Sequence, residues 1–298
     1  MKLKPKIKNA ISGYLFVSTV LIGVIVFTYI PAIQSLVYSF FETDGFLKMN
    51  FVGVDNFVRL FTMDRETSTV FGNTFLYSLV TVPLGLILGY AVALLANMKL
   101  RGITAFRVLF YLPVIIPAVS AGLLWRDLFD PSFGIMAQIF RTLGLGEPTF
   151  FSEANTSMAT LIWTNVWGVG GSMIIWLAAF KNIPVSLYES AKIEGAGALR
   201  RVVSITIPLS APMIFYNLVL SVIGSLQTFQ TMIIAGGTSG KGVGDSLYFI
   251  AVKIYTEAFT RGDMGYACSV AWVLFLIIAI LTWLMFRANK RISYGEDF

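Results

Sequence analysis

Six long apolar segments divide this chain of 298 residues, and each is long enough to cross a lipid bilayer. They cover roughly residues 13–39, 73–97, 106–126, 157–180, 204–234 and 264–286. No Lys, Arg, Asp or Glu lies in the middle of any of them. The bilayer core offers no water to a free backbone amide or carbonyl group, so a crossing segment must form a helix. The sequence therefore predicts an all-α membrane protein with six transmembrane helices.

The composition agrees with this class. Hydrophobic residues make up 56% of the chain and charged residues 13%, and the mean hydropathy is +0.77. A soluble domain carries about 25% charged residues. The N-terminal run M-K-L-K-P-K-I-K resembles the start of a signal peptide. The apolar segment after it continues to about Phe40, which is too long for a signal peptide, so we expect an uncleaved first transmembrane helix.

The basic residues are unevenly distributed between the loops. If the N-terminus is cytoplasmic, fourteen of the 22 Lys and Arg residues lie on that side, with only four of the 16 Asp and Glu residues. Basic residues near span ends favour the cytoplasmic side, so we expect both termini to be cytoplasmic. This distribution accounts for the net charge of +6 and makes nucleic-acid binding a poor interpretation.

Several kinds of chemistry are missing from the sequence. There is no histidine, which excludes a Ser-His-Asp triad and a histidine metal site. The segment G-G-T-S-G-K-G at residues 236–242 lacks the spacing of a phosphate-binding loop. Ion-driven carriers usually hold ionisable groups inside their spans, and these spans hold none. We therefore expect no enzymatic activity, no cofactor in this chain and an energy source in another subunit.

Proline residues interrupt several of the apolar segments. Each removes one backbone hydrogen bond and permits a kink. The kinks are either ordinary bends of membrane helices or hinges of a moving pore. The prolines are Pro31, Pro83, Pro113, Pro117, Pro208 and Pro212.

Polar but uncharged residues recur at helical spacing on the fourth and fifth apolar segments. Small residues on such a face are typical of close helix packing. The alternative is the lining of a path for a polar, uncharged solute such as a sugar, which aromatic rings and neutral hydrogen-bonding groups would suit. The residues are Thr164, Trp167, Gly168 and Gly171 on the fourth segment, and Asn217, Ser221, Gly224, Ser225 and Thr228 on the fifth.

Between these two segments lies a short polar stretch, residues 186–208. Ser186 and Glu189 have capping-box spacing, which predicts the start of a helix. Gly195 follows about two turns later, where a left-handed residue would end that helix. A short, basic helix on the cytoplasmic side, between two spans, is suited to docking on a protein outside the membrane.

The spacing within this stretch resembles a family signature. Glu189-Ser190-Ala191, then Gly195, Ile205 and Ile207-Pro208 fit the E-A-A, three residues, G, nine residues, I-x-L-P pattern. That pattern resembles the cytoplasmic loop of binding-protein-dependent ABC importer permeases, with Ser190 in place of Ala and Ile207 in place of Leu. The stretches F-V-G-V-D-N-F and A-F-T-R-G-D-M-G-Y-A look like the carbohydrate-uptake branch, the maltose and glycerol-3-phosphate type. Within that branch the chain resembles the first of two permease subunits.

The resemblance implies the type I ABC importer fold and a set of partners. These are a second homologous permease, two cytosolic ATPase subunits that bind ATP and Mg, and an extracytoplasmic solute-binding protein. It also implies a coupling helix within residues 186–198 that docks in an ATPase groove, although Glu189 could serve only as a helix cap. The coupling residues would be Tyr188, Glu189, Ser190, Ala191, Glu194, Gly195 and Ala196.

The same resemblance implies a substrate path. In maltose-transporting members the sugar lies midway through the membrane, on the spans either side of the coupling loop. Those members have asparagines where this chain has Thr164, Ser225 and Thr228, and an aromatic residue where it has Gly171, so the pocket is expected to be roomier. The corresponding positions are Thr164, Trp167, Gly168, Gly171, Ser221, Gly224, Ser225 and Thr228.

The chain is thus expected to be the permease subunit of an ATP-driven importer of a sugar or oligosaccharide in a bacterial or archaeal plasma membrane. A permease for a glycerophosphodiester or polyol, an ion-coupled carrier and a membrane scaffold are the alternatives. The predicted organisation is a tail, first span and outer loop at 1–69, a five-helix core with the coupling helix at 70–290, and a cytoplasmic tail at 291–298.

Overall fold

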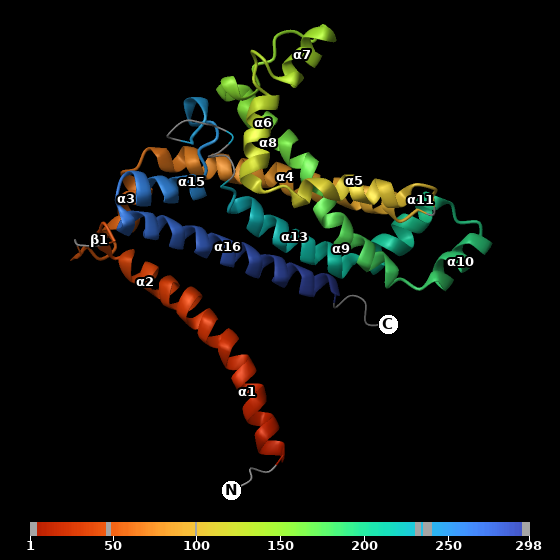
Figure 1. The fold of residues 1–298 in the computed structure, drawn as a ribbon, viewed down its shortest axis with the longest axis horizontal. Coiled ribbons are helices and arrows are strands. Elements are labelled where there is room, and N and C mark those ends of the chain that lie inside the picture. Colours follow the sequence, from red (N-terminus) through yellow and green to blue (C-terminus); the bar gives the residue numbers. More distant parts are fainter. Residues whose placement is uncertain (1–4, 46–48, 99, 230–233, 235–239, 294–298) are drawn as a thin grey trace. The chain divides into compact units, whose positions relative to one another are not determined.

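The computed structural model describes residues 5–45, 49–98, 100–229, 234 and 240–293 (Figure 1). It forms two compact units, residues 1–64 with 254–275 and residues 65–253 with 276–298. The units interleave along the chain, so they do not test the predicted division at residues 69 and 290. Residues 230–233 of the fifth apolar segment and 294–298 of the predicted tail lie outside the described residues.

The first unit contains the first span and the segment that follows it. The predicted span at 13–39 corresponds to a continuous helical stretch, Gly13–Tyr38. The elements are α1 (Pro5–Val24), the π-helix η1 (Ile25–Tyr29), α2 (Ile30–Tyr38), β1 (Phe41–Thr43), β2 (Met49–Phe51), α3 (Asp55–Thr62), the π-helix η6 (Thr256–Thr260) and the first part of α16 (Met264–Ser293).

A small hairpin in this unit departs from the all-α expectation. Strands β1 and β2 pair antiparallel, with Phe41 opposite Phe51. Asn56 on α3 holds the hairpin, because its Nδ2 donates to the backbone oxygens of Ser39 and Phe41 at 3.0 Å each. Gly265 approaches so closely that a Cβ there would lie 1.9 Å from the Phe41 oxygen. Strands of three residues are too short to show a hydropathy pattern, so the sequence did not indicate this hairpin.

The second unit holds the remaining elements. They are α4 (Glu66–Ala96), α5 (Ile103–Ile115), α6 (Ala118–Leu128), α7 (Ile135–Thr142), η2 (Phe150–Ser152), α8 (Ala154–Val166), η3 (Trp167–Val169), α9 (Gly170–Lys181), α10 (Val185–Ile193), α11 (Ala198–Arg201), the π-helix η4 (Val202–Thr206), α12 (Ile207–Leu209), α13 (Ala211–Leu226), η5 (Val243–Asp245), α15 (Ile250–Tyr255) and the second part of α16. Helix α15 runs from this unit into the first.

The predicted spans appear as four helices and two bent pairs in the described part of the chain. The pair α5 and α6 bends by 98°, and the pair Ala198–Leu209 and α13 bends by 69°. The first bend follows from Pro117, which forces Ile116 out of the helical region to φ −74° and ψ 126°. By contrast, α4 continues through Pro83. Proline therefore permits a bend at each position, but the surrounding packing decides where one forms.

The core of the second unit lies where α4 packs against α9 and α13. Trp176 is buried there, and the ring of Tyr90 meets it edge-on with centroids 5.0 Å apart. Two glycines permit the close approach of helices. A Cβ on Gly170 would lie 1.6 Å from the backbone oxygen of Phe110, and one on Gly89 would lie 2.2 Å from Ser172 Oγ.

An ion cluster fixes the start of α4 to α15 and to the segment before it. Lys253 is fully buried, and its Nζ lies 3.2 Å from Glu66 Oε2. Lys241 contributes a second cation 2.7 Å from Glu66 Oε1 and lies over the Tyr248 ring at 4.1 Å. A buried ammonium requires such a counter-charge, since desolvation is costly. This cluster anchors the start of α4.

Candidate functional site

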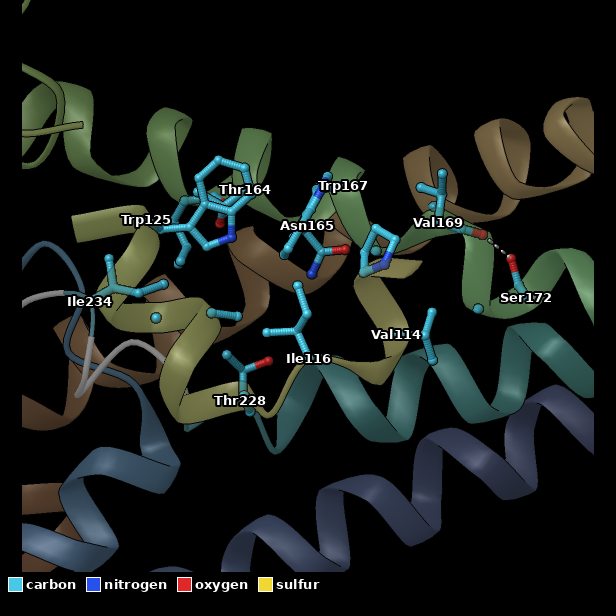
Figure 2. Close-up of a pocket in the computed structure, with 18 of the residues that line it drawn as sticks. Val114, Ile116, Trp125, Thr164, Asn165, Trp167, Val169, Ser172, Thr228 and Ile234 are labelled. Carbon is cyan, nitrogen blue, oxygen red and sulfur yellow. Dashed lines mark hydrogen bonds between the residues drawn. The ribbon is translucent and has the colours of Figure 1, made fainter. Parts of the chain in front are cut away.

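Two adjoining cavities lie inside the second unit, between α4, the α5–α6 bend, the α8–η3–α9 span and α13. Figure 2 shows the larger one. Their volumes are about 710 Å³ and about 620 Å³. The larger volume is within the range of pockets that bury small polar solutes. Residues that line both cavities are Tyr77, Gly85, Ala118, Asn165, Ser221 and Thr228.

All eight residues that the sequence singled out as a substrate path line these cavities. The larger cavity takes Thr164, Trp167, Gly168, Gly171, Ser221 and Thr228, and the smaller takes Ser221, Gly224, Ser225 and Thr228. Asp, Glu, Lys and Arg are absent from the described lining of both. The structure thus brings the two faces together around one space, while their role in transport stays a prediction.

The glycines distinguish between helix packing and a solute path as the role of these two faces. An added Cβ on Gly168 or Gly224 would meet no described atom within 4 Å, so neither glycine is needed for helix packing. The packing glycines are instead Gly170 and Gly89, which lie outside the predicted face. Gly171 is intermediate, since its Cβ would lie 3.3 Å from Val114 Cγ2. The small residues at 168 and 224 therefore enlarge the cavity.

Two indole rings form one wall of the larger cavity. The rings of Trp125 and Trp167 are perpendicular, with centroids 5.1 Å apart, and Figure 2 labels the two residues on either side of Thr164. Trp167 opens the 3₁₀ turn η3, which interrupts the helix expected across the fourth span. Such a mid-span turn is typical of functional segments.

The hydroxyl groups of Thr164 and Ser225 donate to their own helices. Thr164 Oγ1 donates to the Leu161 oxygen at 2.7 Å, and Ser225 Oγ donates to the Val222 oxygen at 3.0 Å. Their oxygens therefore present lone pairs to the cavity. The indole N–H groups and the Asn165 amide supply donors. A mixture of neutral donors, acceptors and aromatic faces can bind a molecule with many hydroxyl groups.

Sequence reasoning missed Tyr77, Trp125 and Asn165. Asn165 Nδ2 donates to Tyr77 Oη at 2.8 Å, which ties α8 to α4 at the point where the cavities meet. Asn165 could have been found as a polar residue inside a span. Tyr77 and Trp125 carry no such signal, because they come from other spans and have no periodic relation to the fourth and fifth.

The predicted coupling helix is present as α10, with different bounds. It begins at Val185 after the N-cap Pro184, and no side chain caps its first turn in the described structure. The capping-box prediction for Ser186 and Glu189 is therefore wrong, because Ser186 already lies inside the first turn. The helix also ends at Ile193, short of the predicted 198. Proline at the boundary sets the start in place of a serine cap.

The end of α10 confirms the predicted left-handed glycine. Gly195 has φ +80°. Its N–H donates to the Lys192 oxygen at 3.1 Å, and the Ala196 N–H donates to the Ala191 oxygen at 2.8 Å. This pair of bonds is the Schellman motif, which a residue without a Cβ adopts at no steric cost. The turn after α10 therefore has one defined shape.

The surface of this segment is suited to a protein partner. Among the predicted coupling residues, Glu189, Ser190, Glu194 and Gly195 are exposed, and Tyr188, Ala191 and Ala196 are partly buried. Ile193 is 87% exposed and Leu199 78% exposed. Figure 1 shows α10 beyond the ends of α9 and α5. Contact of the exposed residues with an ATPase stays a prediction.

Comparison with known proteins places these features in context. Residues 81–294 match a family described as "Binding-protein-dependent transport system inner membrane component". The chain is 37% identical to the probable ABC transporter permease protein YesP of Bacillus subtilis, over 97% of this chain and 94% of YesP. It is 30% identical to the diacetylchitobiose uptake system permease protein NgcF of Streptomyces coelicolor, over 91% and 80%. It is 31% identical to the sn-glycerol-3-phosphate transport system permease protein UgpA of Yersinia pestis, over 93% and 94%.

The fold also matches solved structures. A bacterial ABC transporter involved in the import of the acidic polysaccharide alginate has a chain that superposes with a TM-score of 0.86 at 23% identity. The match covers 97% of this chain and 98% of that one. The same kind of transporter in complex with an alginate pentasaccharide-bound periplasmic protein gives a TM-score of 0.85 at 22% identity, over 98% and 99%. These matches confirm the predicted fold.

Proposed function

Because the chain belongs to the family of inner membrane components of binding-protein-dependent transport systems, we propose that it is the permease that carries a neutral sugar or oligosaccharide through an ATP-driven importer. The chain is a multi-pass membrane component of a transport system. Its spans supply the path for the solute. The described chain offers neutral hydrogen-bonding groups along that path and a separate exposed segment for coupling.

The uncharged lining of the two cavities is the observation that carries this proposal. A permanently charged solute loses its hydration on entering a membrane cavity and needs an opposite charge to replace it. The described lining offers hydroxyls, the amides of Asn165 and Gln227, and two indole rings. Aromatic faces and neutral polar groups fit the apolar and hydroxylated faces of a sugar ring. The relative NgcF, a diacetylchitobiose uptake permease, supports a sugar of this kind.

The energy for transport comes from partner subunits in this proposal. Two cytosolic ATPases bind ATP and Mg, and each holds the coupling helix of one permease. This chain supplies α10, a second homologous permease supplies the other helix, and a binding protein delivers the solute to the outer face. Closure of the ATPases moves α10, and the spans change between inward- and outward-facing states. Both termini and α10 then lie on the cytoplasmic side, as the basic residues favour.

A phosphorylated solute is the second candidate, and the relative UgpA favours it. An sn-glycerol-3-phosphate or glycerophosphodiester permease would need a cation near the phosphate. A polyol would be compatible with the same neutral lining. An ion-coupled carrier is disfavoured, because the middle of each span holds no ionisable residue.

Reconstitution of the complete complex in proteoliposomes tests the proposal. The complex contains both permeases, the ATPases and the binding protein, and the solutes are neutral disaccharides, glycerol, and sn-glycerol-3-phosphate. We expect ATP hydrolysis stimulated by the loaded binding protein and ATP-dependent uptake of a neutral sugar. Uptake of sn-glycerol-3-phosphate alone would overturn the choice of solute. Uptake that persists without the ATPase subunits would overturn the importer assignment.

A further inference from the structure

A continuous set of hydrogen bonds runs from α10 to the bend that leads into α13. Tyr188 Oη lies 2.9 Å from Thr206 Oγ1, at the end of the π-helix η4. Ser210 Oγ donates to the Thr206 backbone oxygen at 2.6 Å. Tyr90 Oη on α4 lies 2.9 Å from the same Ser210 Oγ. Four residues thus join the coupling segment, the bend and α4 within the second unit.

The direction of one of these bonds follows from its other partner. The Ser210 hydroxyl is used on the Thr206 oxygen, so Tyr90 is the donor to Ser210. Either hydroxyl can donate in the Tyr188–Thr206 bond, because the other acceptor near Thr206 Oγ1, the Arg201 oxygen, lies 3.5 Å away. Removing either phenol leaves a hydroxyl on the bent span without that partner.

Thr206 and Ser210 are buried at 3% and 2% exposure. Buried polar groups inside a membrane protein need their partners, so these contacts hold the local geometry. The backbone between them is unusual. A π-helix precedes Pro208, where the wider turn accommodates a proline that cannot donate, and the span then bends by 69° at Ser210. The contacts therefore lie at the point where this span has the least regular backbone.

The bent span connects the two candidate sites. Its first part follows the Gly195 turn. Helix α13 begins after Ser210 and carries Ser221 and Ser225 at the cavities, and Thr228 lies just beyond its end. Among the described contacts, Tyr188 is the only predicted coupling residue whose side chain is hydrogen-bonded to this span. We propose that the Tyr188–Thr206 hydrogen bond transmits the movement of α10 to α13. The Tyr90–Ser210 bond holds the bend against α4.

This inference rests on the proposed docking of α10 to an ATPase and adds how its motion reaches the cavity. Tyr188 and Thr206 are positioning residues, because they contact no cavity directly. Without their bond, α10 would still dock and ATP would still be hydrolysed. The irregular backbone of η4 would then deform when α10 moves, and α13 would not move with it. The result is ATP hydrolysis with less transport.

A distance measurement on the whole complex tests whether the Tyr188–Thr206 bond couples α10 to α13, and it needs no known solute. Spin labels are placed at Ser186→Cys on α10 and Leu220→Cys on α13, both exposed in this structure, after Cys268→Ala. We expect one narrow distance distribution, kept when ATP and vanadate trap the complex. Tyr188→Phe or Thr206→Val is expected to broaden it. An unchanged distribution in both variants would overturn the inference.

Coupling gives the second readout. We expect each single variant to lower the ratio of solute transported to ATP hydrolysed about fivefold, roughly the effect of one hydrogen bond. The double variant should be no worse than either single one, since both remove the same bond. Thr206→Ser keeps the hydroxyl and should retain coupling, and Tyr216→Phe, on an exposed face of α13, should match the wild type.

Two results would refute this role of the Tyr188–Thr206 bond. One is a double variant whose loss of coupling equals the sum of the two single losses. The other is a Thr206→Ser variant with coupling as low as that of Thr206→Val. If Thr206→Val assembles poorly, the test rests on Tyr188→Phe, which removes the same bond at a partly exposed residue. Failure of the proposed function is a separate outcome. It would appear as a wild-type complex with no ATP-dependent uptake of a neutral sugar, whereas the distance measurement needs only ATP and vanadate.

Discussion

Replacing Gly195 tests whether the turn after α10 must have its observed shape to transmit motion. Its φ of +80° costs an L-residue about 1–2 kcal/mol. Gly195→Ala should therefore reduce the fraction of correctly shaped turns by about 5- to 30-fold, if the turn can relax to another shape. Gly195→Pro is more severe, since proline holds φ near −65° and lacks the N–H that donates to the Lys192 oxygen at 3.1 Å.

The assay is solute uptake per ATP hydrolysed in proteoliposomes with the complete complex. We expect a graded loss, with Gly195→Ala impaired and Gly195→Pro uncoupled. Membrane insertion and yield should not change, because the residue is exposed and a Cβ there would meet no described atom within 4 Å. Gly197→Ala is the matched control. Gly197 is equally open, but its φ of −63° and ψ of 167° are extended backbone that any residue adopts.

Two results would refute this reasoning. Equal coupling in Gly195→Ala and Gly197→Ala would mean that the left-handed conformation is not required. Wild-type transport in Gly195→Pro would count against the docking role of the whole segment. If only Gly195→Pro fails to assemble, the turn is needed for folding in that variant. The comparison of Gly195→Ala with Gly197→Ala then tests the role of the turn in coupling.

Two further predictions concern the cavities and the core. Thr228→Leu combined with Ser225→Leu should narrow the cavities and change solute selectivity with ATPase coupling kept, and unchanged uptake kinetics across a sugar panel would place this face outside the path. Gly170→Ala should sharply reduce the yield of folded protein in detergent, since its Cβ would lie 1.6 Å from the Phe110 backbone oxygen, whereas Gly168→Ala, with open space around it, should give normal yield. Equal yields of the two alanine variants would contradict the packing assignment.

The number and class of the spans could be predicted from hydropathy, because a bilayer forces each long apolar segment into a helix whatever its neighbours are. The Gly195 conformation was predictable for a local reason. Two bonds close the turn after α10, and both partners lie within five residues in the chain. The start of α10 was not predictable from the capping pattern, since Pro184 and Ser186 both offer acceptable starts and only the path of the chain from α9 chooses between them.

The cavity was predictable on one side only. Thr164 and Thr228 lie on faces that helical periodicity reveals, and both line the space. Periodicity is a property of one helix, so it could not indicate that Tyr77 and Trp125 complete the same wall from other spans.

The apolar segments, the loop charges and the spacing after Glu189 are local properties, and they were enough to predict a six-span permease with a coupling helix. The choice of Pro117 over Pro83 as the place of a sharp bend, the Tyr188–Thr206 bond and the meeting of α4 with α8 came only with the assembled fold. Each depends on contacts between residues far apart in sequence, whose energies are set by packing and desolvation and leave no pattern along the chain.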